Sequence, residues 1–297
     1  AAETPQQKKA GIPDTIDQFY ADTMKGGHNL NDPALVRTLT THAKDAVAWL
    51  VSLGADLNTV GRAGGAKYPR AHRPTDGSAI GPEVIRVLWK AAKDRKMDVR
   101  TQTRATEIIM KDGRVAGVKA TNKDGKVYTI DAKAVVLATG GFGANQDMLV
   151  KYQPKLKGYA TTNQPGATGD GIILAEHAGA ALVDMKQIQA HPTAAPDGTL
   201  ISESVRGDGG ILINAEGKRF TNELLTRDVV SAAELKQPGR FAWVFWDDAT
   251  RKSAKLMDSY ISMGLAVKGG DSITVTCDGA DEEAAAAALE KMFAEIK

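Results

Sequence analysis

The stretch ESVRGDGGILINAEGKRFTNELLTRD, residues 203–228, sets a dense group of charges beside a short apolar run, Ile211–Ile213. Its charged members are Glu203, Arg206, Arg219, Glu223, Arg227 and Asp228. An apolar run of this kind is typical of a buried strand, and a charge next to it needs a partner because an unpaired buried charge is costly. Two interpretations follow: a solvated hairpin with ion pairs, or an anion-binding active site.

Composition narrows the class of protein. The chain has 297 residues, which allows one large domain or two of ordinary size. Its 38 basic and 36 acidic residues give a net charge of +2, so we expect no nucleic-acid partner. The single cysteine excludes an internal disulfide, and we expect no metal site. No apolar run approaches the roughly 20 residues of a membrane span, so we expect a soluble protein, either periplasmic or cytoplasmic.

The first hundred residues have helical periodicity. Residues 1–14 are polar and predict a loose lead-in. Helices are predicted over 14–27, 31–56 and 82–96. The apolar positions of the second predicted helix that we expect to point inward are Leu35, Leu39, Ala46, Trp49 and Leu50, and those of the third are Val84, Ile85, Leu88 and Ala92.

The pattern then changes to strands. Residues 98–131 alternate apolar and polar side chains around two Lys-Asp-Gly turns, which predicts three antiparallel strands. The run AVVLATGG, residues 134–141, is continuously apolar up to Thr139 and predicts a strand buried on both faces. A helix is predicted over 171–183 and two further strands over 209–217 and 241–247.

Two glycine-rich loops are candidate ligand-binding sites. Adjacent glycines at the end of the run 134–141 let a backbone or a ligand approach closely, and ligands bind beyond such strand ends in open α/β sheets. The loop TTNQPGATGDG, residues 161–171, leads directly into a helix whose first N–H groups could hold phosphate or ribose oxygens. The alternatives are a tight turn for the first loop and a simple helix cap by Asp170 for the second.

Several motifs together resemble one family. AVVLATGGF, TTNQPGATGDG, QAHPT, ESVRGDGGILIN and GKRFTNELLTRD look like the soluble fumarate reductase flavoproteins, which belong to the succinate dehydrogenase and fumarate reductase flavoprotein superfamily. The resemblance extends from about residue 14 to residue 265. It implies a mixed α+β and α/β fold, in which a partial FAD-binding domain with antiparallel strands carries a capping (clamp) domain of the fumarate reductase type.

This resemblance suggests a division of the chain. The expected parts are a lead-in (1–14), a helical part of the FAD domain (15–100), its strands and glycine loops (101–175), the capping domain (176–267) and a tail (268–297). The tail resembles the last strand and helix of the histidine-containing phosphocarrier of sugar transport. The active histidine of that phosphocarrier has no counterpart in the tail, so we expect no phosphotransfer.

The resemblance also implies a reaction, the reduction of fumarate to succinate. A hydride passes from flavin N5 to one alkene carbon, and Arg227, which matches the family's proton donor, protonates the other. Glu203 and Arg206 match the residues that resupply this proton. His191 and Ser202, with Glu203, match the binding site of one carboxylate of the substrate. A histidine at position 191 favours fumarate over an imidazole substrate, because the related urocanate reductases tend to carry tyrosine there.

The implied cofactor is non-covalent FAD, and its match is incomplete. Thr139, Gly140, Gly141 and Asp170 match flavin-contacting positions, and Ala105 matches a position near the adenine. The family's GxGxxG and His-His-Thr-x-Gly-Gly motifs are not found in this sequence. We therefore interpret the chain as a fumarate reductase or its catalytic and capping portion, with the electron donor in another domain or protein. The alternatives are a fragment or chimera that does not bind FAD tightly, and a related reductase or oxidase of small dicarboxylates.

Overall fold

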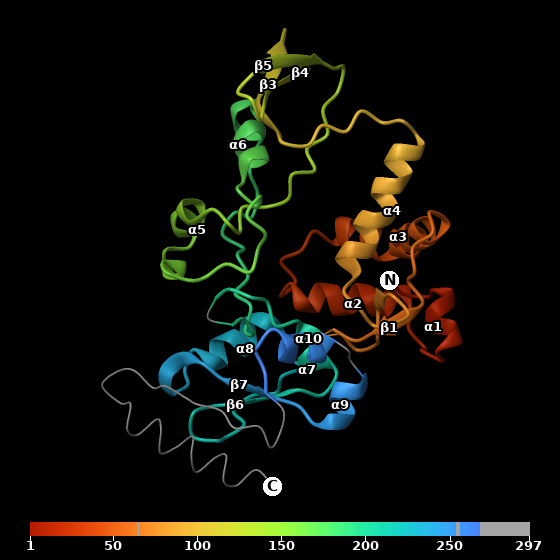
Figure 1. Ribbon diagram of the computed structural model, residues 1–297, viewed down its shortest axis with the longest axis vertical. Coiled ribbons are helices and arrows are strands. Elements are labelled where there is room, and N and C mark those ends of the chain that lie inside the picture. Colours follow the sequence, from red (N-terminus) through yellow and green to blue (C-terminus); the bar gives the residue numbers. More distant parts are fainter. Residues whose placement is uncertain (64–65, 196, 254–255, 268–297) are drawn as a thin grey trace. The chain divides into compact units, whose positions relative to one another are not determined.

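The computed structural model describes residues 1–63, 66–195, 197–253 and 256–267 (Figure 1). The chain forms two compact units. Of the described residues, the first unit contains Ala1–Lys96, Ala190–Thr193 and those from Ile201 to Val267. The second contains Met97–Gln189 and Ala194–Leu200. The predicted strand and helix of the tail, residues 268–297, lie outside the described residues.

The N-terminal part of the first unit is helical. Its elements are α1 (Pro5–Lys9), α2 (Ile16–Gly26), α3 (Pro33–Ser52) and α4 (Ile80–Asp94), with the short antiparallel pair β1 (Thr59–Gly61) and β2 (Ala71–Arg73). The Asp32 side chain caps α3 by accepting hydrogen bonds from the Ala34 and Leu35 amides, and Pro33 supplies the first turn. The three helices predicted in this region are thus confirmed.

The inward face predicted for α3 is wrong except at Leu50, which packs against the core of Ala55, Leu57 and Val87. Leu35, Leu39 and Trp49 are 70%, 57% and 54% exposed, whereas Val36 and Thr40 are the buried side chains of this helix. The helix packs against α2, while Leu35, Leu39 and Trp49 stay exposed among the described residues. Periodicity identifies an apolar face, but burial also requires a neighbouring element that covers it.

The inward face predicted for α4 is also wrong in part. Val87, which was not among the predicted positions, is fully buried in a core with Ala55 and Leu57, whereas the predicted Ile85 is largely exposed. Leu88 packs against this core as expected. The helix therefore buries a face rotated from the one that its apolar residues indicated.

The expected loose lead-in, residues 1–14, is also corrected. Thr4 caps α1 and is 1% exposed, as is Gln7. The Gln7 side-chain amide donates to the Asp14 carboxylate at 3.0 Å and to the Pro69 carbonyl at 2.8 Å. Polar side chains are buried here because each has a hydrogen-bonding partner, which the composition of the segment does not reveal.

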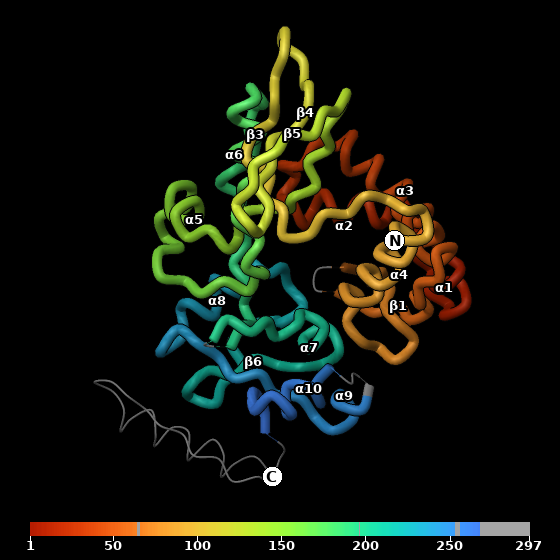
Figure 2. The backbone as a smooth tube through the Cα atoms, turned by 45° about the horizontal axis from the view of Figure 1, so that its top comes forward, coloured from red at the N-terminus to blue at the C-terminus, as the bar shows by residue number. Residues whose placement is uncertain are grey.

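The C-terminal part of the first unit combines short helices with one strand pair, and these elements gather together in both views of the molecule (Figures 1 and 2). They are α7 (Glu203–Gly207), β6 (Ile211–Ile213), α8 (Arg227–Glu234), η2 (Pro238–Arg240), β7 (Trp243–Phe245), α9 (Asp248–Ser253) and α10 (Leu256–Ser262). β6 and β7 are antiparallel, with Leu212 opposite Val244. The two strands predicted here are confirmed, and Leu212 is fully buried.

The second unit contains a three-stranded antiparallel sheet in the order β3 (Thr103–Lys111), β4 (Arg114–Asn122), β5 (Val127–Asp131). This sheet confirms the predicted hairpins. Its other elements are α5 (Gln146–Tyr152), η1 (Pro154–Leu156) and α6 (Asp170–His177), and α6 lies against β3 (Figure 1). The helix predicted over 171–183 is thus confirmed in its first half.

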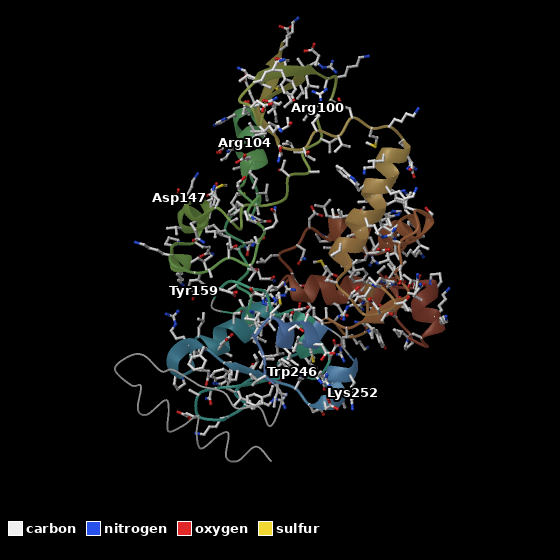
Figure 3. The ribbon with its side chains drawn as sticks, viewed as in Figure 1. Arg100, Arg104, Asp147, Tyr159, Trp246 and Lys252 are labelled. Atoms are coloured by element: carbon white, nitrogen blue, oxygen red, sulfur yellow. The ribbon has the colours of Figure 1, made fainter. Side chains whose placement is uncertain are left out.

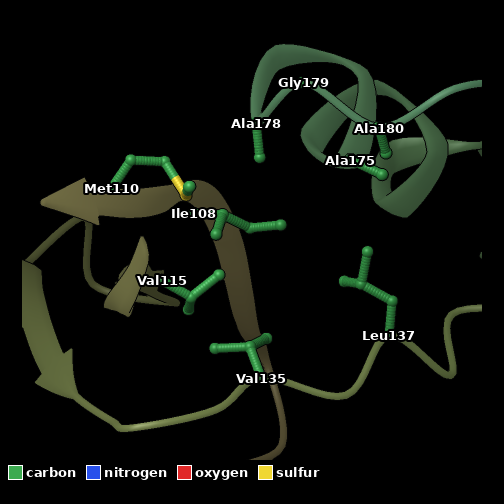
Figure 4. A pocket seen from close by; sticks show the side chains of 9 residues that line it. All are labelled: Ile108, Met110, Val115, Val135, Leu137, Ala175, Ala178, Gly179 and Ala180. Carbon is green, nitrogen blue, oxygen red and sulfur yellow. The ribbon is translucent and has the colours of Figure 1, made fainter. Parts of the chain in front are cut away.

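The strand predicted over residues 134–141 is not formed. These residues have no strand pairing, and Val136 is 88% exposed. A strand buried on both faces needs neighbouring strands and covering layers, and the described residues supply neither. Val135 and Leu137 instead line an open apolar hollow of about 330 Å³ with side chains of β3, β4 and α6 (Figure 4).

The described residues contain neither a membrane-spanning helix nor a metal-binding cluster of side chains. No helix in these ranges combines the length and apolar character that crossing a membrane requires. Nor do their His, Cys, Asp and Glu side chains form a group of three or more that could hold a metal ion.

Candidate functional site

The short helix α7 presents two of the predicted site residues on one face. Ser202 is its N-cap, and the Ser202 hydroxyl accepts a hydrogen bond from the Ser204 amide at 3.3 Å. Glu203 and Arg206 follow at a spacing of three residues, which places them next to each other along the helix surface. The Tyr260 hydroxyl of α10 accepts a hydrogen bond from the Ser202 amide at 2.8 Å and so ties this helix to the core.

Arg227, the first residue of α8, binds Glu203 directly. Its Nε and Nη2 atoms donate to Glu203 Oε2 at 2.9 and 2.7 Å. The two side chains are 35% and 13% exposed, so the pair is shielded from water more than a surface ion pair is. Arg227 thus points into the protein toward a carboxylate, and about a third of its side chain still meets solvent.

Arg206 lies on the other side of the same carboxylate. It is 1% exposed, and its Nη2 atom is 3.7 Å from Glu203 Oε1. Its Nη1 atom donates to the Glu223 carbonyl at 2.6 Å, but Nε and Nη2 have no hydrogen-bond partner among the described residues. Burial, opposed by the Glu203 carboxylate, lowers the pKa of Arg206 below its ordinary value. Glu203 therefore bridges two guanidinium groups, one buried and one facing solvent.

His191 belongs to a short segment of the first unit that is fixed by backbone contacts. The Ser231 hydroxyl of α8 donates to the Ala190 carbonyl at 3.1 Å, and the Ile201 amide donates to the Thr193 carbonyl at 3.1 Å. His191 Nδ1 lies 3.2 Å from the Thr193 amide and 3.0 Å from its carbonyl, whereas the buried Nε2 atom has no partner among the described residues. An orphaned buried nitrogen of this kind is suited to a ligand.

The charge on His191 follows from its surroundings. Burial, followed by the nearby positive charge of Arg227, lowers the pKa of His191 to about 4. The imidazole is therefore neutral near neutral pH and carries one N–H. When Nδ1 accepts from the Thr193 amide, the hydrogen lies on Nε2, which can then donate to a carboxylate.

The first unit therefore brings the predicted substrate and catalytic residues together. Arg227, Arg206 and Glu203 all act electrostatically on His191, and Ser202 directly precedes Glu203. Two guanidinium groups face one carboxylate and a neutral imidazole, so the cluster carries a local positive charge. Such a charge balance suits a small anion.

The remaining charges of residues 203–228 agree with the solvated-hairpin interpretation. Arg219 is exposed and pairs with Glu223 at 2.6 Å, and Asp228 pairs with His28 at 3.1 Å in an exposed position. The Glu223 carboxylate is buried and also accepts from the Leu212 amide at 2.8 Å, so it fastens this loop to β6. Each of the two interpretations thus describes part of the stretch.

Glu234, at the end of α8, is half-buried and was not among the predicted site residues. Burial raises the pKa of its carboxyl to about 7, against the attraction of Arg206. One signal was present in the sequence, because Glu234 is seven residues beyond Arg227 and hence on the same face of a helix.

The predicted cofactor residues lie in the second unit, where the two glycine loops meet. The Gly169 amide donates to the Gly141 carbonyl at 3.2 Å, and the Thr139 side chain lies so close to Gly171 that a Cβ atom there would collide with it. A hollow of about 240 Å³ opens beside Thr139 and Gly140. The two loops thus form one continuous surface.

Asp170 starts α6 and is held by Arg104. Its carboxylate accepts from Arg104 Nε and Nη2 at 2.7 and 3.1 Å, and from the Thr168 hydroxyl at 2.9 Å. Arg104 is labelled in Figure 3. These hydrogen bonds, Arg104 first, lower the pKa of Asp170. The weakly matched Ala105 lies exposed on β3, opposite Ala120 of β4.

These residues fit an edge of FAD. A Cβ atom added to Gly140 or Gly141 would meet nothing within 4 Å, so space is open next to the backbone of both residues. Gly140 has a φ of +70°, a conformation that favours glycine. The glycine loops therefore supply a ligand-accessible backbone edge, and the pyrophosphate-binding motif that completes an FAD site has no counterpart in the sequence.

Comparison with known proteins identifies the family to which the chain belongs. The family described as FAD binding domain matches residues 1–296, which defines the class as an FAD-binding flavoprotein. A fumarate reductase (cytochrome) of Shewanella frigidimarina is 50% identical over 268 residues, which cover 90% of this chain and 47% of that protein. An NADH:fumarate oxidoreductase of Klebsiella pneumoniae (strain 342) is 46% identical and is covered over 29% of its length.

A solved structure of a fumarate reductase also matches this chain. The open conformation of a flavocytochrome c3 fumarate reductase matches with a TM-score of 0.75 at 44% identity, over 89% of this chain and 47% of that one. The chain belongs to the FAD binding domain family, within the fumarate reductase and succinate dehydrogenase flavoprotein superfamily. It spans less than half the length of these relatives.

Proposed function

We propose that the chain is the catalytic and capping portion of an FAD-dependent fumarate reductase, and that its first unit binds fumarate. The observation that carries this proposal is the bridge of Glu203 between the buried Arg206 and the partly exposed Arg227, beside the unpartnered Nε2 atom of His191. An isolated ion pair would not need this arrangement. A site that binds an anion and moves a proton would.

In this proposal His191 Nε2 and the Ser202 hydroxyl hold one carboxylate of fumarate. Both groups donate neutral hydrogen bonds, and Arg227 supplies positive charge next to them. The arginine is the proton donor to the alkene carbon. FAD, when bound, supplies the hydride for the other alkene carbon.

Arginine is an unusual acid because a guanidinium group is normally fully protonated in proteins. It can donate only if its proton is replaced at once. Arg206, whose pKa is lowered by burial, first gives a proton to the Glu203 carboxylate. Glu203 Oε2, at 2.7 Å from Arg227 Nη2, is in hydrogen-bond contact to pass this proton to the neutral Arg227.

A fumarate reduction assay tests the proposed function. The FAD-loaded protein, supplied with an artificial reduced dye, should oxidise the dye when fumarate is added and form succinate. Fumarate-independent dye oxidation, or none at all in protein that retains FAD, would overturn the proposal. Maleate, aspartate and longer unsaturated diacids in the same assay distinguish fumarate reduction from a related reductase or oxidase of small dicarboxylates.

We expect His191→Asn to weaken dicarboxylate binding. The asparagine side chain places a polar atom near the position of Nδ1, so the contact with Thr193 is kept and only the Nε2 donor is lost. The loss of one hydrogen bond to a charged group, about 1.5–3 kcal/mol, corresponds to a dissociation constant for succinate raised roughly 10- to 100-fold. Calorimetry on the FAD-loaded protein measures it, with the exposed His42→Asn as the control.

The same variant should change the pH dependence of stability. The pKa of His191 is about 4 in the folded protein, below its ordinary 6.5, so the unfolded chain binds this proton first as the pH falls. The contribution of His191 to the free energy of unfolding is therefore lost progressively as the pH falls from about 6.5 to about 4. In His191→Asn this decrease should be absent. Equal pH slopes for both proteins in urea unfolding would show that His191 is not the buried neutral group described above.

In the second unit, Thr139, Gly140, Gly141, Asp170 and Ala105 would hold FAD. We expect Gly141→Val to impair FAD binding without loss of fold, because its side chain would enter space that is open in the protein and Gly141 has no positive φ. A valine side chain in the space that FAD would occupy should weaken FAD binding by about 1–3 kcal/mol, or roughly 10- to 100-fold in affinity. Flavin absorbance after gel filtration measures retention. Gly81→Val, at another open glycine without positive φ, is the control, and full FAD retention by Gly141→Val would contradict the assignment.

The alternative of a fragment that binds FAD weakly is favoured by the exposed apolar surface around residues 134–141 and by the missing GxGxxG motif. A colourless protein that stays folded after incubation with FAD would support it. The proposed electron donor is a further domain or a separate protein.

A further inference from the structure

A buried tyrosine, Tyr260 of α10, lies in the core against which α7 packs. Its side chain is 4% exposed and packs with Met257 and with Val205 of α7, which are 0% and 1% exposed. A helix of five residues has few internal hydrogen bonds, so α7 depends on contacts with the rest of the protein to stay in place. Val205 provides such a contact on the apolar side of the helix.

The Tyr260 hydroxyl adds a second contact, at the residue just before this helix. It accepts a hydrogen bond from the Ser202 amide at 2.8 Å, across 58 residues of sequence. Ser202 is the N-cap, so its amide lies outside the hydrogen bonds of α7 and needs another partner where it is partly buried. The tyrosine ring is enclosed by the core, and its hydroxyl therefore defines where the Ser202 backbone lies.

The position of this backbone decides what the Ser202 side chain can contact. Its hydroxyl oxygen accepts from the Ser204 amide at 3.3 Å and from the Ser204 hydroxyl at 3.0 Å, and it keeps its own hydrogen to donate. The preceding residue, Ile201, is tied to Thr193 by hydrogen bonds of 3.1 and 2.8 Å, and the Thr193 amide lies 3.2 Å from His191 Nδ1. Both proposed donors to the substrate carboxylate thus belong to one hydrogen-bonded framework.

The charged residues of α7 are held by other contacts. Glu203 accepts two hydrogen bonds from Arg227, and Arg206 Nη1 donates to the Glu223 carbonyl at 2.6 Å. Loss of the Tyr260 hydroxyl should therefore leave the proposed proton path in place and act on the N-cap serine. Binding and proton transfer can thus be separated by experiment.

We propose that Tyr260 is a positioning residue of the substrate site. Its hydroxyl holds the backbone of Ser202, so that the Ser202 hydroxyl donates to one carboxylate of the dicarboxylate. The inference rests on the proposed function, because that function gives Ser202 its role. Tyr260 acts through this backbone contact and takes no part in the chemistry.

Tyr260→Phe removes the hydroxyl and keeps the ring in the core. We expect the dissociation constant of succinate to rise roughly 3- to 10-fold, because the hydrogen bond from Ser202 to the carboxylate is misplaced. In the FAD-loaded protein KM for fumarate should rise by a similar factor while kcat changes less than about 2-fold, as expected when ground-state binding is lost. Calorimetry with succinate and dye-linked turnover measure these changes.

Met257→Leu is the matched control in the same core. This volume-conserving substitution changes the packing around Tyr260 and keeps the hydroxyl. Both variants should unfold at lower urea concentration than the wild-type protein, but only Tyr260→Phe should change the dissociation constant of succinate. If both variants bind succinate as the wild-type protein does, or if both weaken its binding equally, Tyr260 has a packing role only and the inference is overturned.

A double-mutant cycle tests whether Tyr260 acts through Ser202. Ser202→Ala should itself raise the dissociation constant of succinate roughly 3- to 10-fold. In that background Tyr260→Phe should add less than about 2-fold, because the hydroxyl that it positions is gone. Multiplied effects of the two substitutions would show that the tyrosine acts on binding by another route.

Hydrogen exchange of the Ser202 amide needs neither a ligand nor a folded variant. In the wild-type protein we expect this amide to exchange at least 10-fold more slowly than an unbonded amide, because it donates to a buried hydroxyl. In Tyr260→Phe the protection should be lost. Rapid exchange in the wild-type protein would overturn the inference even if Tyr260→Phe does not fold.

The outcomes separate the two proposals. A wild-type protein that neither binds succinate nor reduces fumarate overturns the proposed function, and with it the role of Tyr260. A wild-type protein that does both, together with an unchanged dissociation constant in Tyr260→Phe, overturns the positioning role alone.

Discussion

Arg227→Lys should abolish fumarate reduction, with kcat lowered about 1,000-fold or more, while the protein stays folded and keeps its FAD. General acid catalysis typically contributes 100- to 10,000-fold, and this substitution removes the proposed acid. Lysine keeps the positive charge, so the electrostatic attraction for a dicarboxylate is largely kept. The expected loss is therefore in kcat more than in KM.

The reason lies in the geometry of the guanidinium group. Arg227 Nε and Nη2 both donate to Glu203 Oε2, so the planar guanidinium group is held in one orientation toward this carboxylate. A lysine ammonium is a single point and cannot contact the relay and a substrate carbon in the same fixed arrangement. Arg37→Lys, at an exposed arginine paired with Asp17, is the matched control. Near full activity of Arg227→Lys would show that the proton comes from another group.

Part of this site could be predicted from the sequence. The spacing of Glu203 and Arg206 places them together on any helix. Arg227 is 24 residues from Glu203, and no local rule joins them; family resemblance supplied that pairing, and tertiary structure supplied the contact. The burial of Arg206 could not be predicted, because arginine is rarely buried completely and nothing in its neighbours in the sequence indicates it.

The incorrect predictions of fold have a shared cause. Leu39 and Trp49 were expected inside because they form an apolar stripe, and residues 134–141 were expected as a buried strand because they are continuously apolar. Both inferences assume that another layer covers the apolar surface. The chain spans 47% of the Shewanella relative, and among the described residues these surfaces have no covering layer. Local pattern predicts element type well, but burial depends on the whole assembly of elements.

The second large effect is on stability, at Arg70. This arginine is 8% exposed and donates from Nε and Nη2 to both oxygens of Asp14, at 2.7 and 2.8 Å, and from Nη1 to Asp22 at 2.6 Å. The Asp14 side chain is fully buried, with Gln7 as its other side-chain partner. We expect Arg70→Met to lower the free energy of unfolding by about 3–5 kcal/mol, because it leaves the buried Asp14 carboxylate without an opposing charge. Urea unfolding of the purified protein measures this change.

A double variant isolates the cause. If Arg70→Met destabilises the protein because it leaves the Asp14 charge unpaired, adding Asp14→Asn should restore much of the lost free energy of unfolding. The amide is uncharged and can still accept the hydrogen bond from Gln7. Arg37→Met, which breaks an exposed arginine–aspartate pair, should cost no more than about 1 kcal/mol. Equal losses for Arg70→Met and the double variant would mean that the packing of the arginine, which lies over the Phe19 ring at 4.9 Å, matters more than its charge. In either case the buried polar side chains of Thr4, Gln7, Asp14, Arg70 and His72 are joined by hydrogen bonds. These bonds explain why a segment that looks like a loose lead-in in the sequence is folded.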